Sequence, residues 1–79
     1  MPTPPPFARG RQWRWRASQI KKLDKRVCYD PQTRHEYDVD PRKNGVWHEI
    51  DPRSGEYRDV DPLTGQPVAG AEGRWRPLH

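Results

Sequence analysis

The chain has 79 residues, which is enough for one domain but not two, and a chain of this length buries only about 60% of its unfolded surface on folding. Hydrophobic residues make up 30% and charged residues 33%, a composition close to that of disordered proteins, but four Trp, three Tyr and one Phe favour a thin aromatic core. The single cysteine, Cys28, excludes an internal disulfide and a cysteine-based zinc cluster, and no apolar run approaches the ~20 residues of a membrane span.

The net charge of +4 is unevenly distributed. Residues 1–27 carry eight basic side chains and one acidic one, whereas residues 28–73 carry five basic and ten acidic side chains. Carboxylates repel phosphate, so an acidic centre between basic ends favours chemistry on a polyanion over simple binding of it. Most of the ten carboxylates are nevertheless expected to be solvated or to cap turns.

Residues 1–10, with Pro2, Pro4, Pro5 and Pro6, are predicted to form a flexible proline-rich leader, and residues 11–79 a single small β domain. The domain begins with RQWRWR, in which the two tryptophans alternate with two arginines as in a strand.

A short helix is predicted next, because Ser18 can cap its start and Ile20, Leu23 and Val27 are spaced i, i+3, i+7. Its exposed face would be cationic.

From residue 26 onward, turns recur at intervals of 10, 11 and 10 residues, each marked by an Asp-Pro pair at Asp30-Pro31, Asp40-Pro41, Asp51-Pro52 and Asp61-Pro62. The last three pairs are followed by Gly45, Gly55 and Gly65. Asp caps the turn backbone, Pro fixes φ, and Gly adopts the left-handed conformation that rejoins a strand.

The segments between the turns, 26–30, 35–40, 46–51 and 56–61, are rich in Val, Ile, Tyr and Trp. They predict a mainly β fold: a small, highly twisted antiparallel meander of about four strands with the short N-terminal helix. Apolar residues of opposite parity within two of these strands indicate bulges or a sheet covered in part on both faces.

These motifs occur in an order that resembles the C-terminal ribonuclease domain of colicin E3 and of related bacteriocin and contact-dependent inhibition toxins. The similarity covers roughly residues 13–65: RWR, a basic segment, KRVCYD, an acidic strand with a His, an N-G turn and a strand ending I-D-P-R-S-G. The joint order carries the resemblance, because each motif alone is common in β meanders.

The resemblance implies a cytotoxic ribonuclease that cleaves ribosomal RNA in the decoding region of the small subunit, without a metal or other cofactor. It also implies an acidic immunity protein as a partner, and action in the bacterial cytoplasm, either as a secreted protein or as the delivered part of a larger toxin. Asp30, which follows Tyr29, matches the Asp that follows an aromatic residue in the family, and His35 matches the family's His. The family's Glu would fall at Val39, so Asp38 or Asp40 must substitute for it.

Metal-free RNA cleavage needs a base for the ribose 2′-OH, an acid for the leaving 5′-oxygen and cations for the phosphorane. A carboxylate among Glu36, Asp38 and Asp40 is the candidate base, with His35 as the acid; alternatively, Asp30 works with His35 across the hairpin. Strand alternation places His35 on the other face from the three carboxylates unless a bulge intervenes. The arginines predicted to bind RNA or phosphate are Arg14, Arg16, Arg34, Arg58, Arg74 and Arg76.

His48 and Glu49 form a second candidate site, although a His between core positions is more often structural. No spacing of His35, His48 and carboxylates indicates a metal site. Trp13, Trp15 and Trp75 alternate with arginines and suit stacking on unpaired bases, but in so small a domain a Trp more often covers the sheet. The alternative function is a non-catalytic β module that binds RNA or a protein partner.

Overall fold

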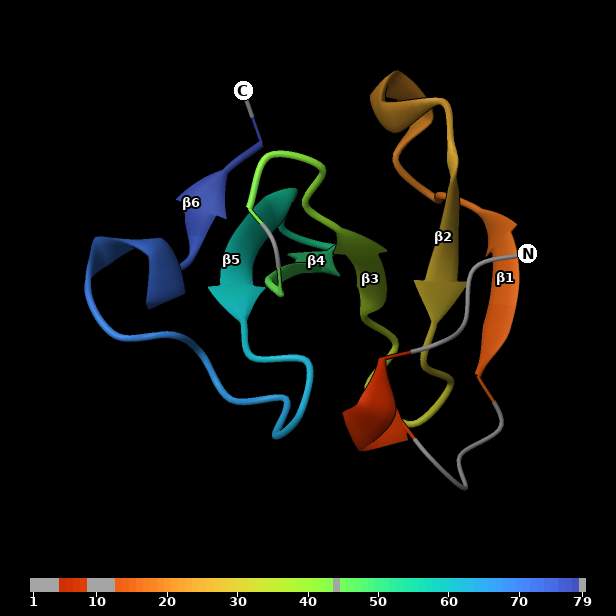
Figure 1. The fold of residues 1–79 in the computed structure, drawn as a ribbon. Coiled ribbons are helices and arrows are strands. Elements are labelled where there is room, and N and C mark those ends of the chain that lie inside the picture. Colours follow the sequence, from red (N-terminus) through yellow and green to blue (C-terminus); the bar gives the residue numbers. More distant parts are fainter. Residues whose placement is uncertain (1–4, 9–12, 44, 79) are drawn as a thin grey trace.

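The computed structural model describes residues 5–8, 13–43 and 45–78. These residues form a six-stranded antiparallel sheet in which each strand pairs with the next along the chain (Figure 1). The elements are η1 (Pro6–Ala8), β1 (Arg14–Ala17), η2 (Lys21–Leu23), β2 (Arg26–Tyr29), β3 (Glu36–Val39), β4 (Trp47–Asp51), β5 (Glu56–Val60), η3 (Ala71–Gly73) and β6 (Arg76–Pro77). The mainly β antiparallel meander is therefore confirmed, with six strands rather than four.

The Asp-Pro turns explain why the chain reverses where it does. In all four turns an aspartate Oδ1 accepts a hydrogen bond from the backbone N–H two residues later, at distances of 2.8–2.9 Å. The three glycines that follow have φ between 75° and 78°, as the turn chemistry predicts. In the first turn the corresponding left-handed position is held by Arg34, at φ 66°.

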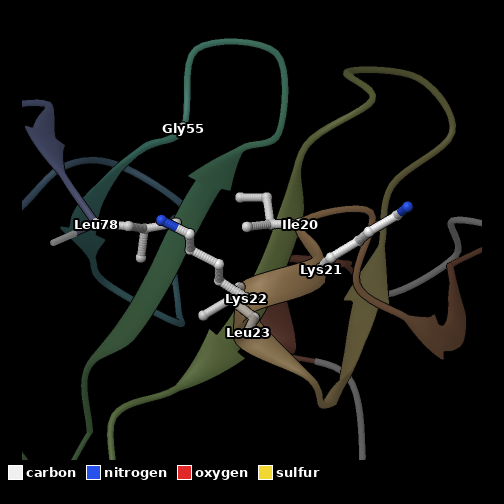
Figure 2. Close-up of a pocket in the computed structure, with 6 residues that line it drawn as sticks. All are labelled: Ile20, Lys21, Lys22, Leu23, Gly55 and Leu78. Carbon is white, nitrogen blue, oxygen red and sulfur yellow. The ribbon is translucent and has the colours of Figure 1, made fainter.

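The predicted N-terminal helix is wrong, because only the single 3-10 turn η2 forms in that segment. The turn ends at Asp24, whose φ of 44° is left-handed, and Val27 lies in β2. Ser18 N–H donates to the carbonyl of Lys25 at 2.9 Å, which closes the β1–β2 hairpin around η2. Ile20 and Leu23 instead line a groove of about 470 Å³ with Leu78 near the C-terminal end of the described chain (Figure 2).

The pairing register assigns the strand side chains to two faces. One side of the sheet, which we call the Glu49 face, carries a row of successive cross-strand partners from β2 to β5: Cys28, Tyr37, Glu49 and Arg58. The other side, which we call the His48 face, carries the residues one position along each strand, among them the cross-strand partners Asp38, His48 and Asp59. Ile50 is buried on the His48 face and Val60 on the Glu49 face. The opposite parity seen in the sequence therefore reflects a sheet covered in part on both faces.

The aromatic core lies on the Glu49 face. Cys28, Tyr37 and Val60 form its buried centre, and Phe7, Trp13, Trp15 and Trp47 pack against them. Phe7 lies in η1, which is drawn in red beside the sheet in Figure 1, so the described part of the expected leader, residues 5–8, covers the core. Residues 1–4, 9 and 10 of that leader lie outside the described residues.

No helix within the described residues has the length and apolar character needed to cross a membrane.

Candidate functional site

The carboxylate of Glu49 is the centre of a polar cluster on the Glu49 face. Its Oε2 accepts hydrogen bonds from the Tyr37 hydroxyl at 2.7 Å and from His35 Nδ1 at 2.8 Å. Its Oε1 accepts one from Arg58 Nε at 2.7 Å. Glu49 itself is only 5% exposed. A buried carboxylate with three donors, one of them a guanidinium, is held in a fixed position and in its charged form.

Opposing effects act on the pKa of Glu49. Burial raises it, but hydrogen bonds from Tyr37, His35 and Arg58 and the charge of Arg58 together bring the pKa below its ordinary value. The pKa of the Tyr37 hydroxyl is raised, first by burial and then by its bond to Glu49. Tyr37 is therefore a fixed donor, and Glu49 a weak base that serves best to orient its neighbours.

The imidazole of His35 lies between Glu49 and Trp75. Its side chain is 25% exposed, and its ring meets that of Trp75 edge-on at 5.6 Å between centroids. The anionic carboxylate of Glu49 can only accept a hydrogen bond, so Nδ1 of His35 is the donor and carries the proton of the neutral ring. With no partner for Nε2 among the described residues, this nitrogen is the one able to exchange a proton.

Arg58 shares both partners of this imidazole, Glu49 and Trp75. Its guanidinium carbon lies 4.3 Å from the centroid of the Trp75 ring, and only its Nε is used by Glu49. Within the part of the chain that the structure describes, its two terminal nitrogens have no hydrogen-bond partner. The arrangement suits a phosphate group that is held beside His35.

The β2–β3 turn positions His35. Asp30 N–H donates to the His35 carbonyl at 3.0 Å, and Arg34 N–H donates to the Asp30 carbonyl at 2.7 Å. The Asp30 carboxylate is fully buried and accepts from Gln32 N–H at 2.9 Å and from the Thr33 hydroxyl at 3.2 Å. These contacts make Asp30 a residue that shapes the turn preceding the imidazole.

The structure places the other predicted carboxylates away from His35, on the His48 face. Glu36 is fully buried and accepts from the Ser18 hydroxyl at 2.6 Å and from Gln19 N–H at 2.7 Å. Asp38 forms an ion pair with Lys25. The expected bulge at His35 is not needed, because its carboxylate partner comes from β4 on its own face.

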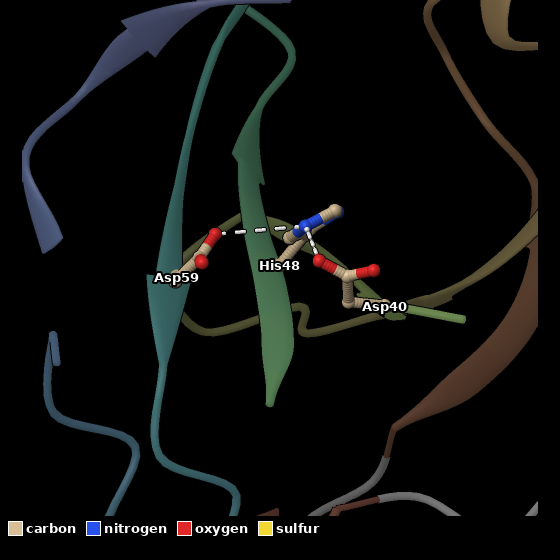
Figure 3. Close-up of side chains that lie close together, drawn as sticks. All are labelled: Asp40, His48 and Asp59. Carbon is tan, nitrogen blue, oxygen red and sulfur yellow. Dashed lines mark hydrogen bonds and ion pairs between the residues drawn. The ribbon is translucent and has the colours of Figure 1, made fainter. Parts of the chain in front are cut away.

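His48 and Glu49 do not form one site, since neighbouring residues of β4 point to opposite faces. His48 Nε2 lies 3.0 Å from Asp40 Oδ2 and 3.5 Å from Asp59 Oδ1 (Figure 3). The Asp40 carboxylate also accepts from Arg42 N–H at 2.8 Å, and this bond, the largest effect, lowers its pKa.

The predicted RNA-binding arginines are dispersed. Arg14 and Arg16 line a pocket of about 310 Å³ with Tyr29 and Pro31, and the Arg16 guanidinium carbon lies 3.6 Å from the centroid of the Tyr29 ring. The remaining positions differ: Arg34 and Arg74 are exposed, Arg58 joins the Glu49 cluster, and Arg76 pairs with Asp59 at 3.1 Å. Of the three tryptophans expected to stack on bases, Trp13 and Trp15 pack on the core and Trp75 lies beside His35.

Sequence reasoning missed Glu49 as the partner of His35, and it missed Tyr37 and Trp75 as members of the cluster. A signal was present in the turn at residues 40–46. Folding the flanking strands about this turn pairs Tyr37 with Glu49.

Comparisons with protein-family models, with curated proteins and with solved structures find no match to this chain.

Proposed function

We propose that the protein is a metal-free endoribonuclease whose active centre consists of His35, Glu49 and Arg58, with Trp75 beside them. The observation that carries the proposal is the contact of Glu49 with both a partly exposed imidazole and a guanidinium, at 2.8 Å and 2.7 Å. The three supply a general base, its orienting carboxylate and a phosphate-binding cation.

In this mechanism Nε2 of His35 removes the proton from a ribose 2′-OH. The 2′-oxygen attacks the adjacent phosphorus, the bond to the 5′-oxygen breaks, and that oxygen takes a proton from a water molecule, whose hydroxide is neutralised by the proton that His35 took up. The products are a 2′,3′-cyclic phosphate and a 5′-hydroxyl. Arg58 binds the phosphoryl oxygens, and Glu49 stabilises the imidazolium that forms, as carboxylates paired with a catalytic His do. Glu49 therefore replaces the carboxylates of the 36–40 segment in the proposal, and His35 acts first as the base.

The backbone at Arg34 supports this placement. A non-glycine residue at φ 66° costs free energy, and such strain clusters at functional sites. The strained residue here directly precedes His35. The basic surface around Arg14 and Arg16, with the Tyr29 ring beneath a guanidinium, supports contacts with the RNA backbone and with unpaired bases.

Ribosomal RNA is the proposed substrate, and action in the bacterial cytoplasm and inhibition by an acidic immunity protein belong to the same proposal. All three rest on the resemblance to the colicin E3 ribonuclease domain.

The test is to incubate the purified chain with ribosomes in EDTA and to map the ends of the small-subunit RNA. The proposal predicts one main cut in the decoding region that leaves a 2′,3′-cyclic phosphate. A second arm uses free RNA in place of ribosomes. If free RNA is cut but ribosomes are not, the catalytic mechanism stands and the ribosome is rejected as the substrate. Intact RNA in both arms, together with salt-sensitive binding, would leave the non-catalytic RNA-binding module instead.

A further inference from the structure

The His48 face carries a second cluster of ligating side chains, formed by Asp40, His48 and Asp59 (Figure 3). One ligand atom from each residue lies within 4.8 Å of the other two. The two carboxylates are buried, with Asp40 7% and Asp59 1% exposed. This cluster takes no part in the proposed cleavage of RNA, because it is on the opposite side of the sheet from Glu49.

The fold fixes all three residues before any ligand binds. His48 and Asp59 are direct cross-strand partners in β4 and β5. Asp40 is held at the end of β3 by its backbone bond to the Val46 carbonyl, at 3.1 Å, and by the bond of its Oδ1 to Arg42 N–H. Its other oxygen, Oδ2, is thereby directed to His48.

One nitrogen faces oxygens from two different carboxylates. His48 Nε2 carries at most one proton and can satisfy one acceptor fully, yet Asp40 Oδ2 and Asp59 Oδ1 lie 3.0 Å and 3.5 Å away. Nitrogen and oxygen ligands bind zinc at about 2.0–2.2 Å, so two ligands of a tetrahedral zinc ion are about 3.3 Å apart. The two observed distances lie on either side of that value.

Three cations among the described residues border the cluster, of which two pair with Asp59 and the third is Arg42. Lys43 Nζ lies 3.0 Å from Asp59 Oδ2, and Arg76 contacts Asp59 Oδ1 at 3.1 Å. The Lys43 side chain is 46% exposed, so it can move into solvent when a divalent cation neutralises Asp59. A cavity of about 210 Å³, lined by these residues and Tyr57, leaves room for a water molecule as the fourth ligand.

We propose that Asp40, His48 and Asp59 bind a divalent transition-metal ion of the zinc type, through one imidazole nitrogen and two carboxylate oxygens. Imidazole favours zinc over magnesium or calcium, which prefer sites made of oxygen alone. The ion would join the end of β3 to β4 and β5, and so stabilise the sheet that carries the Glu49 cluster on its other side.

The test is a calorimetric titration of the tag-free, metal-free full chain with Zn²⁺, repeated with Co²⁺ to record the visible spectrum of a four-coordinate site. We expect one ion per chain, no competition from equimolar Mg²⁺, and a rise in the midpoint of thermal unfolding. His48→Gln should weaken binding at least about 100-fold. The matched control is His35→Gln on the opposite face, which should bind as the wild type does.

Lys43→Met gives an independent readout, because it removes the cation that competes for Asp59 and should tighten Zn²⁺ binding. Circular dichroism checks that each variant is folded, and Asp40→Asn replaces His48→Gln if the latter is not. The proposal is overturned if the wild type shows no saturable binding of Zn²⁺, or if His35→Gln abolishes binding while the His48 or Asp40 variant retains it. Neither outcome depends on whether the protein cleaves RNA.

Discussion

Replacing Glu49 with Gln tests how strongly its carboxylate holds the Glu49 face together. The substitution keeps the size of the side chain but removes its charge, and it puts an NH₂ group where one oxygen accepts hydrogen bonds. The wild-type carboxylate accepts bonds of 2.7, 2.8 and 2.7 Å from Tyr37, His35 and Arg58. Bonds to a charged group contribute about 1.5–3 kcal/mol each, and removing one partner of a buried ion pair costs about 3–5 kcal/mol.

The amide oxygen of Gln still satisfies one of the donors, so we expect Glu49→Gln to lower the free energy of unfolding by about 3 kcal/mol. This is a large fraction of the roughly 4–12 kcal/mol typical of a chain of this length. Urea unfolding followed by tryptophan fluorescence measures the change.

Tyr37→Phe removes only one of the three bonds to the charged carboxylate and leaves Glu49 two donors, so it should cost about 1.5 kcal/mol, the lower end of that range. Glu72→Gln, at an exposed carboxylate, is the control and should leave the urea midpoint unchanged. A loss below about 0.5 kcal/mol for Glu49→Gln would show instead that the buried carboxylate contributes no more than a surface charge.

Three further predictions concern the fold. The pKa of Glu49 in the folded chain lies below its ordinary value of 4.5, so its contribution to stability is full above pH 4.5 and is lost as the pH falls through the folded pKa. In acid titrations of stability, Glu49→Gln should therefore lose less stability than the wild type over that range, and equal losses would contradict this. Burial, aided by the charge of a neighbouring carboxylate, raises the pKa of the Cys28 thiol to about 11. A thiol reagent at pH 8 should therefore label Cys28 only when the protein unfolds, and immediate labelling of the native protein would be the contrary result. Gly65→Ala should destabilise the protein more than Gly55→Ala. Both glycines have φ near 75°, but only at Gly65 would a Cβ lie within 2.8 Å of the Phe7 ring. Equal shifts in the midpoint of thermal unfolding would show that this contact is not rigid.

The turns could be predicted from the sequence because their determinants are local. Each Asp caps a backbone N–H two residues away, and each following Gly adopts a positive φ, so neither depends on the remainder of the fold. The helix prediction was wrong because apolar spacing alone does not include distant contacts. Ser18 and Gln19 are held by Glu36, 18 and 17 residues away, and this contact favours a hairpin connection over a helix.

The site was harder to predict because its residues come from four separate segments. His35 was proposed from the sequence as the imidazole of the site, and its carboxylate was sought among sequence neighbours. Glu49 is 14 residues away, and it becomes a partner only when the register of β3 and β4 is known. Arg58 and Trp75 depend in addition on the pairing of β5 with its own neighbours.

We propose that the Glu49 face, and His35 in particular, carries out the cleavage of RNA. The most direct measurement is the rate of RNA cleavage in EDTA by two matched variants, His35→Ala and His48→Ala, which alter the two described imidazoles on opposite faces of the sheet. We expect His35→Ala to lose about 10²–10⁴-fold in rate with the fold retained, while His48→Ala stays near the wild-type rate. A folded His35→Ala variant that cleaves as fast as the wild type would contradict it.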